Sequence, residues 1–483
     1  MIYLERKNKF YTKSSFDNFS EIKINDSGFS SIEGYRFKTR QMFTARTKVG
    51  IYLWIVQHVN ELYILFSEIG VINLKKYLTY VVSPKVIYVD AVKIKLDESE
   101  ESIYFFKKGI ILKNNYSQKD LRSANKVSKN LEPDTVVKTY VIETLSKDSK
   151  QVKDFAYSGK SLKFSNPNNN WLVAGSGNFA ASILIPSIIN SGGHVIACCS
   201  NSGASSFYLA KAFKIPNVYS SIEEMISADL PAKNILIATP PVWHPDHIKV
   251  AIEANLKIYS EKPVAVSYED IEKLQAYSGY ENIMIGFNRR FAPAVQSLVI
   301  SNEYIENKNN LIVTYIVNLG EFSVSMATKE IGGGTTVGSC CHYLDLLEYI
   351  CDSEIMNFFV VAQKDSSDNL VYGSSFSCIL NMTNGSTANL IFKRSLSPSN
   401  GIKELISIVG ESINANISDF KKLTINGKNS NFYLFSKGWK GAMKHFHSSS
   451  ILQKSSKTST LLKGNRITKL AMDIDKEIER VRS

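Results

Sequence analysis

The chain has 483 residues, of which 44% are hydrophobic and 11% aromatic, an ordinary composition for a folded protein of two or three domains. The most apolar early window, residues 50–72, is interrupted by amide, His and Glu side chains, which excludes an ordinary membrane-spanning helix. The N-terminus lacks the apolar core and cleavage site of a signal peptide. We therefore predict a folded cytoplasmic protein of bacterial origin.

The cysteines and the charge distribution indicate which metal sites and partners to expect. The six cysteines form no C-x-x-C pair and no Cys/His cluster, so we expect reduced, mostly buried thiols and no metal site. Residues 1–165 hold 28 Lys and Arg against 18 Asp and Glu, which accounts for 10 of the 12 net positive charges. Such a region could attract acidic partners or anionic lipid. The alternative is a solvated lysine-rich surface, and no nucleic-acid partner is predicted.

Residues 1–157 give mixed signals and no recognisable chemistry. Residues 48–56 and 86–94 are strand-like, and residues 121–131 are helix-like. We predict a basic N-terminal domain of mixed structure and unknown role. Residues 158–170 are rich in Ser, Gly, Asn and Pro and are expected to form a linker.

A glycine turn follows the linker. Four apolar residues from Trp171 lead into Gly175, Gly177 and Ala180, and an apolar helix-like segment continues from there. The first glycine permits a sharp turn, the second lets backbone N–H groups approach a pyrophosphate, and the small third residue lets helix and strand pack closely. Taken alone, the motif fits an ordinary strand-to-helix turn equally well.

From residue 171 onward, strands and helices alternate, which predicts a parallel sheet of Rossmann type over residues 171–295. The expected strands after the first are residues 194–199, 234–238, 257–260 and 283–287. The expected helices are residues 206–213, 222–226, 247–254 and 268–277.

The residues after the second strand bear on the choice of dinucleotide. They read Ser200-Asn201-Ser202-Gly203, without the acid that binds an adenosine ribose 2′-hydroxyl. A 2′-phosphate would meet no carboxylate there, and Ser200 and Asn201 could hydrogen-bond to it. No Arg stands nearby, so we predict NAD or NADP as cofactor.

Residues 296–483 form the second predicted unit, a substrate-binding α/β domain. Short β-branched or aromatic runs separated by turns predict a large, mostly antiparallel sheet over residues 311–318, 357–363, 371–381, 386–393, 404–410 and 421–435. Helices are expected at residues 340–351, 442–449 and 467–481. The last of these could pack back on the Rossmann domain.

Five motifs occur in register along this part of the chain. They read Gly175-Ser-Gly-Asn-Phe-Ala180, Ala238-Thr-Pro-Pro-Val-Trp-His244, Glu261-Lys-Pro263, Gly286-Phe-Asn-Arg-Arg-Phe291 and Gly332-Gly-Gly-Thr-Thr-Val-Gly-Ser-Cys-Cys-His-Tyr-Leu-Asp345. Together they resemble the glucose-fructose oxidoreductase and inositol dehydrogenase (Gfo/Idh/MocA) family over about residues 170–450. The chain is most similar to the form found behind a second domain in bi-domain oxidoreductases of surface-polysaccharide gene clusters.

The resemblance implies roles for single residues. Lys262 matches the family's active-site lysine, and Pro263 its turn, with a cis bond in relatives. His342 matches the histidine that accepts the hydroxyl proton, and Asp345 would orient it or balance its charge. Substrate binding is expected of Asn288, Arg289, Arg290 and His342. Cofactor binding is expected of Gly175, Gly177, Asn178, Phe179, Ala180, Ser200, Asn201, Thr239, Pro240, His244, Glu261 and Lys262.

One departure from the family pattern affects the predicted chemistry. Many members carry an aspartate four residues before the histidine, where this chain has Gly338, and Ser339 supplies no acid either. Without that carboxylate, the oxidised hydroxyl could differ, or the site could be weakly active.

We therefore predict an NAD(P)-dependent oxidoreductase that moves hydride between nicotinamide and a secondary hydroxyl or ketone of a sugar or sugar nucleotide. The resemblance suggests a place in surface-polysaccharide biosynthesis, and a homodimer or homotetramer. One alternative is an epimerase or lyase that oxidises its substrate transiently with tightly held cofactor. The other is a non-catalytic nucleotide-binding scaffold.

Overall fold

The computed structural model describes most of the chain from residue 166 onward and separate segments before it. The described residues are 2–6, 9–15, 18–24, 32–33, 59–82, 88–95, 102–108, 141–144, 166–200, 204–219, 221–319, 328–362, 375–394, 403–432, 436–449, 452 and 458–482. The predicted strand at 48–56, the predicted helix at 121–131 and most of the predicted linker lie outside them.

The N-terminal segments form a seven-stranded antiparallel sheet in the order β4-β3-β2-β1-β6-β5-β7. Its strands are β1 (Ile2–Arg6), β2 (Lys9–Ser15), β3 (Asn18–Ile24), β4 (Ile32–Glu33), β5 (Tyr88–Lys95), β6 (Ser102–Lys108) and β7 (Val141–Thr144). The strand predicted at 86–94 is present as β5. The helix α3 (Val59–Val82) was not predicted.

A six-stranded parallel sheet follows in the order β10-β9-β8-β11-β12-β13. Its strands are β8 (Asn170–Ala174), β9 (His194–Cys199), β10 (Asn217–Tyr219), β11 (Asn234–Ile237), β12 (Lys257–Ser260) and β13 (Ile283–Ile285). The chain runs outward from β8 in one direction and then from β11 in the other. The Rossmann topology is confirmed, and its switch point lies at the carboxyl ends of β8 and β11, where open α/β sheets bind ligands.

Helices connect these strands, as the alternating pattern predicted. They are η2 (Ala180–Leu184), a π-helical turn, followed by α6 (Ile185–Asn190), α7 (Ala204–Phe213), α8 (Ile222–Ser227), α9 (His244–Glu253) and α10 (Tyr268–Gln275). All five residues of β8 are buried, as expected for a central strand of a sheet covered on both faces.

The C-terminal part contains an eight-stranded sheet in the order β15-β16-β17-β14-β18-β19-β20-β21, in which only the β14–β17 pair is parallel. Its strands are β14 (Ile312–Leu319), β15 (Ile355–Ala362), β16 (Phe376–Met382), β17 (Thr387–Arg394), β18 (Glu404–Val409), β19 (Asn414–Ser418), β20 (Lys422–Ile425) and β21 (Lys428–Asn431). The mostly antiparallel sheet is confirmed.

Several elements differ from the prediction: β19 was not predicted, and the helices expected at 442–449 and 467–481 span 439–448 and 461–482. The run at 421–435 is a hairpin of β20 and β21, because Asn426 and Gly427 adopt positive φ values of 45° and 82° and turn the chain. The helix expected from residue 340 is α15 (Gly334–Cys351), which begins earlier because Gly333, at φ 77°, turns the chain directly before Gly334.

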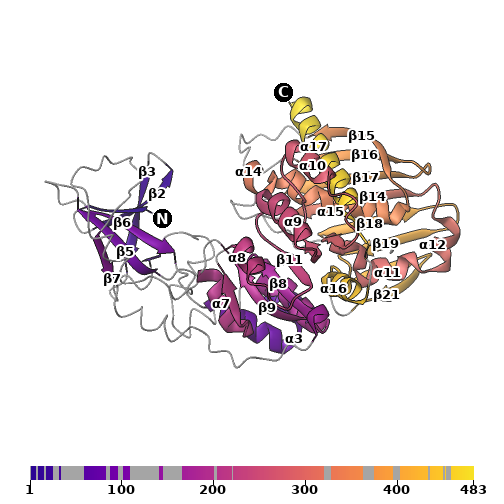
Figure 1. Ribbon diagram of the computed structural model, residues 1–483. Helices are drawn as coiled ribbons and strands as arrows, with labels where there is room; N and C mark the ends of the chain where they lie inside the picture. The colour runs from indigo at the N-terminus through magenta and orange to yellow at the C-terminus, as the bar shows by residue number, and fades with distance from the viewer. Residues whose placement is uncertain are drawn as a thin grey trace. The chain divides into compact units, whose positions relative to one another are not determined.

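The long helices of this part pack together. Helix α15 lies beside α17 (Leu461–Arg482), and α17 also contacts β15, α10 and β13 (Figure 1). The other helices after β13 are α11 (Pro293–Val299), α12 (Asn302–Asn307) and α14 (Lys329–Gly332), which precede α15, and α16 (Trp439–Ser448), which precedes α17; the turn η4 (Asn288–Phe291) directly precedes α11. Within the described ranges, every helix is too short or too polar to cross a membrane.

Candidate active site

The glycine turn after β8 has the shape that a dinucleotide requires. Gly175 has φ 103°, and a Cβ there would lie 2.4 Å from the carbonyl oxygen of Ala238, so only glycine fits. At Gly177 a Cβ would meet nothing within 4 Å, so the protein leaves the outer side of the turn open. Ala180 is buried where the following helix begins. These residues fit a pyrophosphate held against a helix N-terminus.

The other residues predicted to bind cofactor lie around the same strand ends. Asn178 and Phe179 are exposed beside the turn, and the Phe179 ring meets the edge of Trp439 at 5.8 Å between centroids. Thr239, after β11, contacts His247 Nδ1 through its hydroxyl at 2.9 Å, and the next residue, Pro240, is exposed.

His244 is a buried link between two of these loops. Its ring nitrogens lie 2.7 Å from the carbonyl oxygen of Pro263 and 2.8 Å from that of Thr239. Burial lowers the pKa of His244 to about 4, so the ring is neutral and donates to one of the two oxygens at a time. His244 therefore holds the β11 and β12 loops together.

The predicted ribose-side residues are only partly described. Ser200 directly follows β9 and its hydroxyl contacts that of Ser206 at 3.2 Å. Asn201 lies outside the described residues.

Lys262 extends from the carboxyl end of β12 at a turn closed by a cis peptide bond to Pro263. Its ammonium donates a hydrogen bond of 2.6 Å to the carbonyl oxygen of Gly338 on α15. A Cβ at position 338 would lie 2.8 Å from the carbonyl oxygen of Gly332, so the aspartate of many family members would require the backbone to move. Lys262 is thus paired with a neutral backbone carbonyl.

Glu261 is buried beside this lysine, and its Oε1 has no hydrogen-bond partner among the described residues. Burial raises the pKa of Glu261 to about 7, against the opposing effect of the Lys262 charge.

His342 lies on α15 one turn after Gly338. It is half-buried, and the Phe287 ring meets it edge-on at 6.2 Å between centroids. Among the described residues, its buried Nδ1 has no hydrogen-bond partner. Burial lowers the pKa of His342 well below its ordinary value, and the charges of Lys262, Arg289 and Lys437 lower it further. The imidazole is therefore neutral at pH 7 and able to accept a proton.

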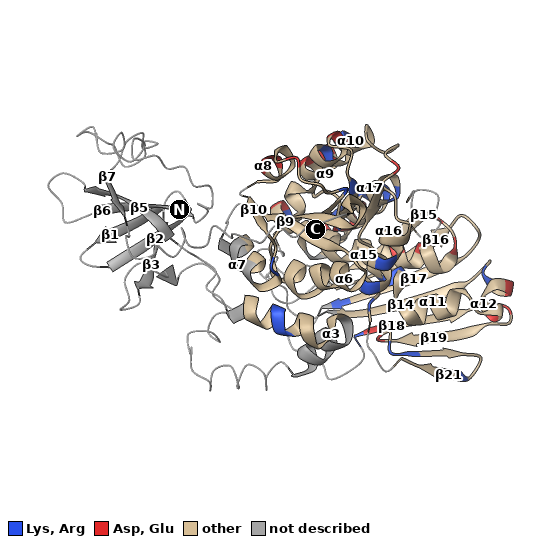
Figure 2. Ribbon diagram, turned by 60° about the horizontal axis from the view of Figure 1, so that its bottom comes forward, with Lys and Arg blue, Asp and Glu red and all other residues tan. Residues whose placement is uncertain are grey.

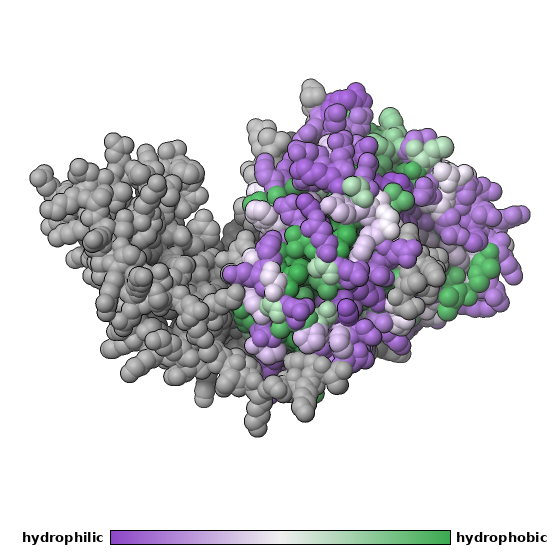
Figure 3. Space-filling view, viewed as in Figure 1, coloured by the Kyte–Doolittle hydropathy of each residue, from purple (hydrophilic) through white to green (hydrophobic). Residues whose placement is uncertain are grey.

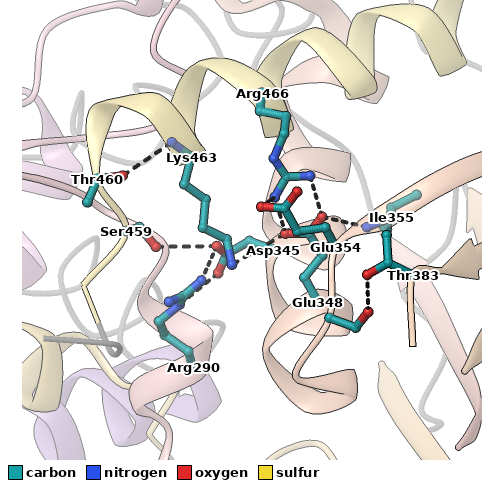
Figure 4. Close-up of polar contacts among 11 residues, drawn as sticks. Arg290, Asp345, Glu348, Glu354, Ile355, Thr383, Ser459, Thr460, Lys463 and Arg466 are labelled. Carbon is teal, nitrogen blue, oxygen red and sulfur yellow. Dashed lines mark hydrogen bonds and ion pairs between the residues drawn. The ribbon is translucent and has the colours of Figure 1, made fainter. Parts of the chain in front are cut away.

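Asp345 and Arg290 form a buried ion pair with each other. The Asp345 carboxylate accepts hydrogen bonds from Arg290 Nε and Nη2 and from the Ser459 hydroxyl (Figure 4). Both side chains of the ion pair are 1% exposed. A buried arginine needs a carboxylate partner, and Asp345 supplies it. The expected roles of Asp345 beside His342 and of Arg290 in substrate binding stay predictions.

A second ion-pair group on α15 and α17 adjoins this pair. Glu348 accepts hydrogen bonds from both Nη atoms of Arg466 at 2.6 Å and contacts Lys463 at 3.3 Å (Figure 4). The two groups join the η4 turn, α15 and α17, and they support the site without forming part of it.

Arg289 lies close to His342, in contrast to Arg290. Its Nε and Nη2 donate to Glu404 at 2.9 and 3.0 Å, and its guanidinium lies 4.9 Å from the centre of the Tyr343 ring. Lys437 donates to the same carboxylate at 2.5 Å. Burial alone would raise the pKa of Glu404, but Arg289 and Lys437 hold it well below its ordinary value.

Sequence reasoning missed Glu404 and Lys437. No motif marks either residue, although Glu404 is the only charged residue of the apolar run 404–410. The remaining predicted substrate residue, Asn288, donates a 2.6 Å hydrogen bond to the Lys437 carbonyl, while its buried Oδ1 has no partner among the described residues. A Cβ on Gly438 would lie 2.2 Å from the Asn288 carbonyl oxygen, so the glycine lets Lys437 approach the η4 turn.

The structure also bears on the predictions about cysteines and metal binding. All six cysteines are buried and free, as predicted. In the part of the chain that can be described, no three His, Cys, Asp or Glu side chains are arranged to hold a metal ion.

Comparison with known proteins supports the prediction that the strands and the glycine turn belong to a dinucleotide-binding Rossmann fold. Residues 169–285 match the model of an oxidoreductase family with an NAD-binding Rossmann fold, GFO_IDH_MocA. These residues therefore resemble the cofactor domain of the Gfo/Idh/MocA family. The predicted resemblance is confirmed.

Relatives and solved structures agree with this family. The chain is 27% identical to an inositol 2-dehydrogenase of Corynebacterium glutamicum over 191 residues, which are 37% of this chain and 52% of that protein. The chain thus spans about half the length of this curated relative.

Two solved structures share the fold over a longer stretch. UDP-N-acetylglucosamine 3-dehydrogenase GnnA of Acidithiobacillus ferrooxidans is 15% identical, with a TM-score of 0.53 over 65% of this chain and 99% of that chain. The WlbA dehydrogenase of Bordetella pertussis, solved with NADH and UDP-GlcNAcA, is 15% identical, with a TM-score of 0.53 over 64% and 95%.

Proposed function

We propose that this protein is an NAD(P)-dependent oxidoreductase that interconverts a secondary hydroxyl and a ketone on a sugar or sugar nucleotide. One observation carries the proposal: α15 presents both the Gly338 carbonyl that accepts a hydrogen bond from Lys262 and, one turn later, a neutral His342 whose Nε2 makes no hydrogen bond to a described residue. A cation and a neutral base are the two groups that oxidation of an alcohol needs.

We assign the following roles in catalysis and cofactor binding. The bound dinucleotide supplies the hydride acceptor. The Lys262 ammonium would stabilise negative charge that develops on the substrate oxygen. His342 would take the hydroxyl proton at Nε2, and in the reductive direction it would return that proton. Gly175, Gly177 and Ala180 would hold the pyrophosphate, and His244 would fix the loops beside it.

The similarity to GnnA and WlbA, whose names and contents include UDP-sugars, favours a sugar nucleotide as substrate. We also propose that the protein acts in surface-polysaccharide synthesis and uses NAD or NADP. The proposed domain boundaries are residues 1–157, 158–170, 171–295 and 296–483.

The test is an activity assay of the full chain against a panel of sugars and sugar nucleotides, with NAD and NADP in parallel. The absorbance of the reduced nicotinamide measures turnover. Lys262→Met and His342→Asn should each reduce kcat/KM at least a hundredfold. Lys249→Met, at an exposed lysine of α9, is the matched control and should leave it unchanged. Unchanged turnover in both site variants would refute the assignment.

A non-catalytic scaffold is the second candidate, because Gly338 removes a carboxylate that relatives have. That candidate predicts dinucleotide binding without any sugar-dependent change in the nicotinamide. Turnover with retained cofactor and no net reduction would instead indicate transient oxidation.

We also propose that the protein forms a homo-oligomer through the outer face of the eight-stranded sheet. The strand register places Phe359, Val361, Ile379, Ile312 and Ile316 on one face, and each is between 38% and 65% exposed. Four of the eight strands, β14, β15, β16 and β19, carry no charged residue, and charged residues lie on helices such as α10 and α12 (Figure 2). Hydrophobic surface also appears near α12, where Ile300 and Ile305 are exposed (Figure 3). Uncharged apolar surface of this kind favours self-association.

A further inference from the structure

Two aromatic side chains meet beside the glycine turn. Phe179, two residues after Gly177, is 39% exposed, and Trp439 is half-buried at the first position of α16. The two rings meet edge to face with their centroids 5.8 Å apart. Because the outer side of Gly177 is open, a dinucleotide bound at this turn would come next to the aromatic pair.

Close packing against the η4 turn fixes the position of Trp439. The preceding residue, Gly438, has φ 94°, and a Cβ there would lie 2.5 Å from the backbone nitrogen of Ala292. A Cβ on Gly441 would lie 2.9 Å from the carbonyl oxygen of Phe291. A side chain at either glycine would push the start of α16 away from η4, so the two glycines bring Trp439 close to this turn.

The other end of α16 is held at the amino ends of two strands of the parallel sheet. Lys257, the first residue of β12, donates hydrogen bonds to the carbonyl oxygens of Phe446 and Ser449 at 2.5 and 2.6 Å. The indole nitrogen of Trp171, in β8, donates to His447 Nε2 at 3.0 Å. Since both ends of the helix are held, α16 keeps a fixed position beside the glycine turn.

The neighbours of Trp439 place it on the nicotinamide side of this turn. A dinucleotide whose pyrophosphate lies at the glycine turn extends its nicotinamide toward the reacting groups. The proposed cation Lys262 follows β12, and η4 follows β13, which pairs with β12. Trp439 meets Phe179 of the turn and begins the helix that packs on η4. The indole ring therefore lies between the place of the pyrophosphate and the loops that carry the substrate groups.

We propose that Trp439 covers the nicotinamide half of the bound dinucleotide and slows its release. An indole ring buries a large apolar area when it packs against a ligand, and the loss of such a contact acts mainly on the dissociation rate. The inference rests on the dinucleotide binding of the proposed function, and it concerns how long the cofactor stays bound rather than the reaction.

The dissociation of NADH from the full chain tests this without any sugar. Protein loaded with NADH is mixed with excess NAD in a stopped-flow instrument, and the fluorescence of the reduced nicotinamide reports its release. Trp439→Ala should release NADH at least tenfold faster than wild type, because the covering ring is lost. Trp439→Phe keeps a smaller ring and should stay within threefold of wild type. Lys444→Ala, at an exposed position of the same helix, is the matched control and should behave as wild type.

Binding of AMP separates a direct contact from a general loosening of the turn. AMP lacks the nicotinamide half, so its affinity, measured by displacement of NADH, should differ less than twofold between wild type and Trp439→Ala. A purely structural role of Trp439 would instead weaken AMP and NADH alike. Thermal melting without ligand checks that each variant is folded, and Trp439→Leu takes the place of Trp439→Ala if that variant is not.

Three results would overturn the inference: release of NADH from the folded variant at the wild-type rate, equal weakening of AMP and NADH, or no binding of NADH by wild type at millimolar concentration. Its failure is separable from that of the proposed function. Turnover of a sugar by a protein whose NADH release does not depend on Trp439 refutes the role of Trp439 alone. Retention of NADH that depends on Trp439, without turnover of any sugar, refutes the catalytic proposal alone.

Discussion

At the scale of single residues, burial shifts the pKa values of two side chains at the site, His342 and Glu261. His342 is neutral because burial and three cations lower its pKa, and Glu261 is largely protonated below pH 7 because burial raises its pKa to about 7. Each state has a measurable consequence.

Removal of one cation should strengthen the proton affinity of His342. In Lys437→Met the imidazole loses a neighbouring positive charge, so its pKa should rise toward the ordinary value. A base works only when unprotonated, and the acid limb of the kcat/KM profile should therefore move to higher pH. The profile measured with a neutral substrate checks this, with Lys440→Met as control. An acid limb that stays in place would contradict the proximity of Lys437 and His342.

Glu261 should destabilise the protein above neutral pH. Its folded-state pKa of about 7 lies above the ordinary 4.5, so the native state binds the extra proton and stability falls as pH rises between these values. Glu261→Gln cannot ionise and should gain up to about 3 kcal/mol over wild type at pH 8 but little at pH 4.5. Chemical denaturation at both pH values measures the difference. Glu253→Gln, at an exposed glutamate, should show none, and an equal gain for Glu261→Gln at both pH values would exclude ionisation as the cause.

At the scale of elements, substitutions at a crowded glycine, Gly338, and at an open one, Gly177, distinguish effects on stability from effects on ligand binding. Gly338→Ala places a Cβ 2.8 Å from the Gly332 carbonyl and should cost about 1–3 kcal/mol of stability. Gly177→Ala meets no protein atom and should leave the melting temperature nearly unchanged, yet it should weaken dinucleotide binding because the new methyl group occupies the open side of the turn. Melting curves with and without NADH measure both effects. Unaltered NADH affinity in Gly177→Ala would argue against a pyrophosphate at this turn.

At the scale of the whole molecule, the exposed face of the eight-stranded sheet should determine the oligomeric state. Phe359 and Ile379 are direct cross-strand neighbours on this face. The double variant Phe359→Lys, Ile379→Glu keeps an attractive pair on the sheet but removes apolar contact area, so a dimer or tetramer should dissociate to monomers. Light scattering after size-exclusion chromatography measures the mass. Leu462→Lys, at an exposed position of α17, should leave it unchanged, and a variant that stays oligomeric would place the interface elsewhere.

Local sequence determined much of this protein. The strand, glycine turn and helix after Trp171 are specified by neighbouring residues, because only glycine tolerates the backbone at position 175. The alternation of strand-like and helix-like segments predicted the parallel sheet. The Glu-Lys-Pro motif predicted that Lys262 follows a strand, and in the structure it follows β12. These features depend on contacts between near neighbours or on a short repeating pattern.

Only the tertiary structure decided which arginine lies near His342 and which supports the fold. Arg289 and Arg290 are adjacent and chemically identical, yet one pairs with Glu404, 115 residues away, and the other with Asp345, 55 residues away. Lys437 reaches the same carboxylate from a further segment, and no spacing in the sequence relates these residues. Burial also sets the pKa values of Glu261 and His342, and burial exists only once the distant parts of the chain have packed together.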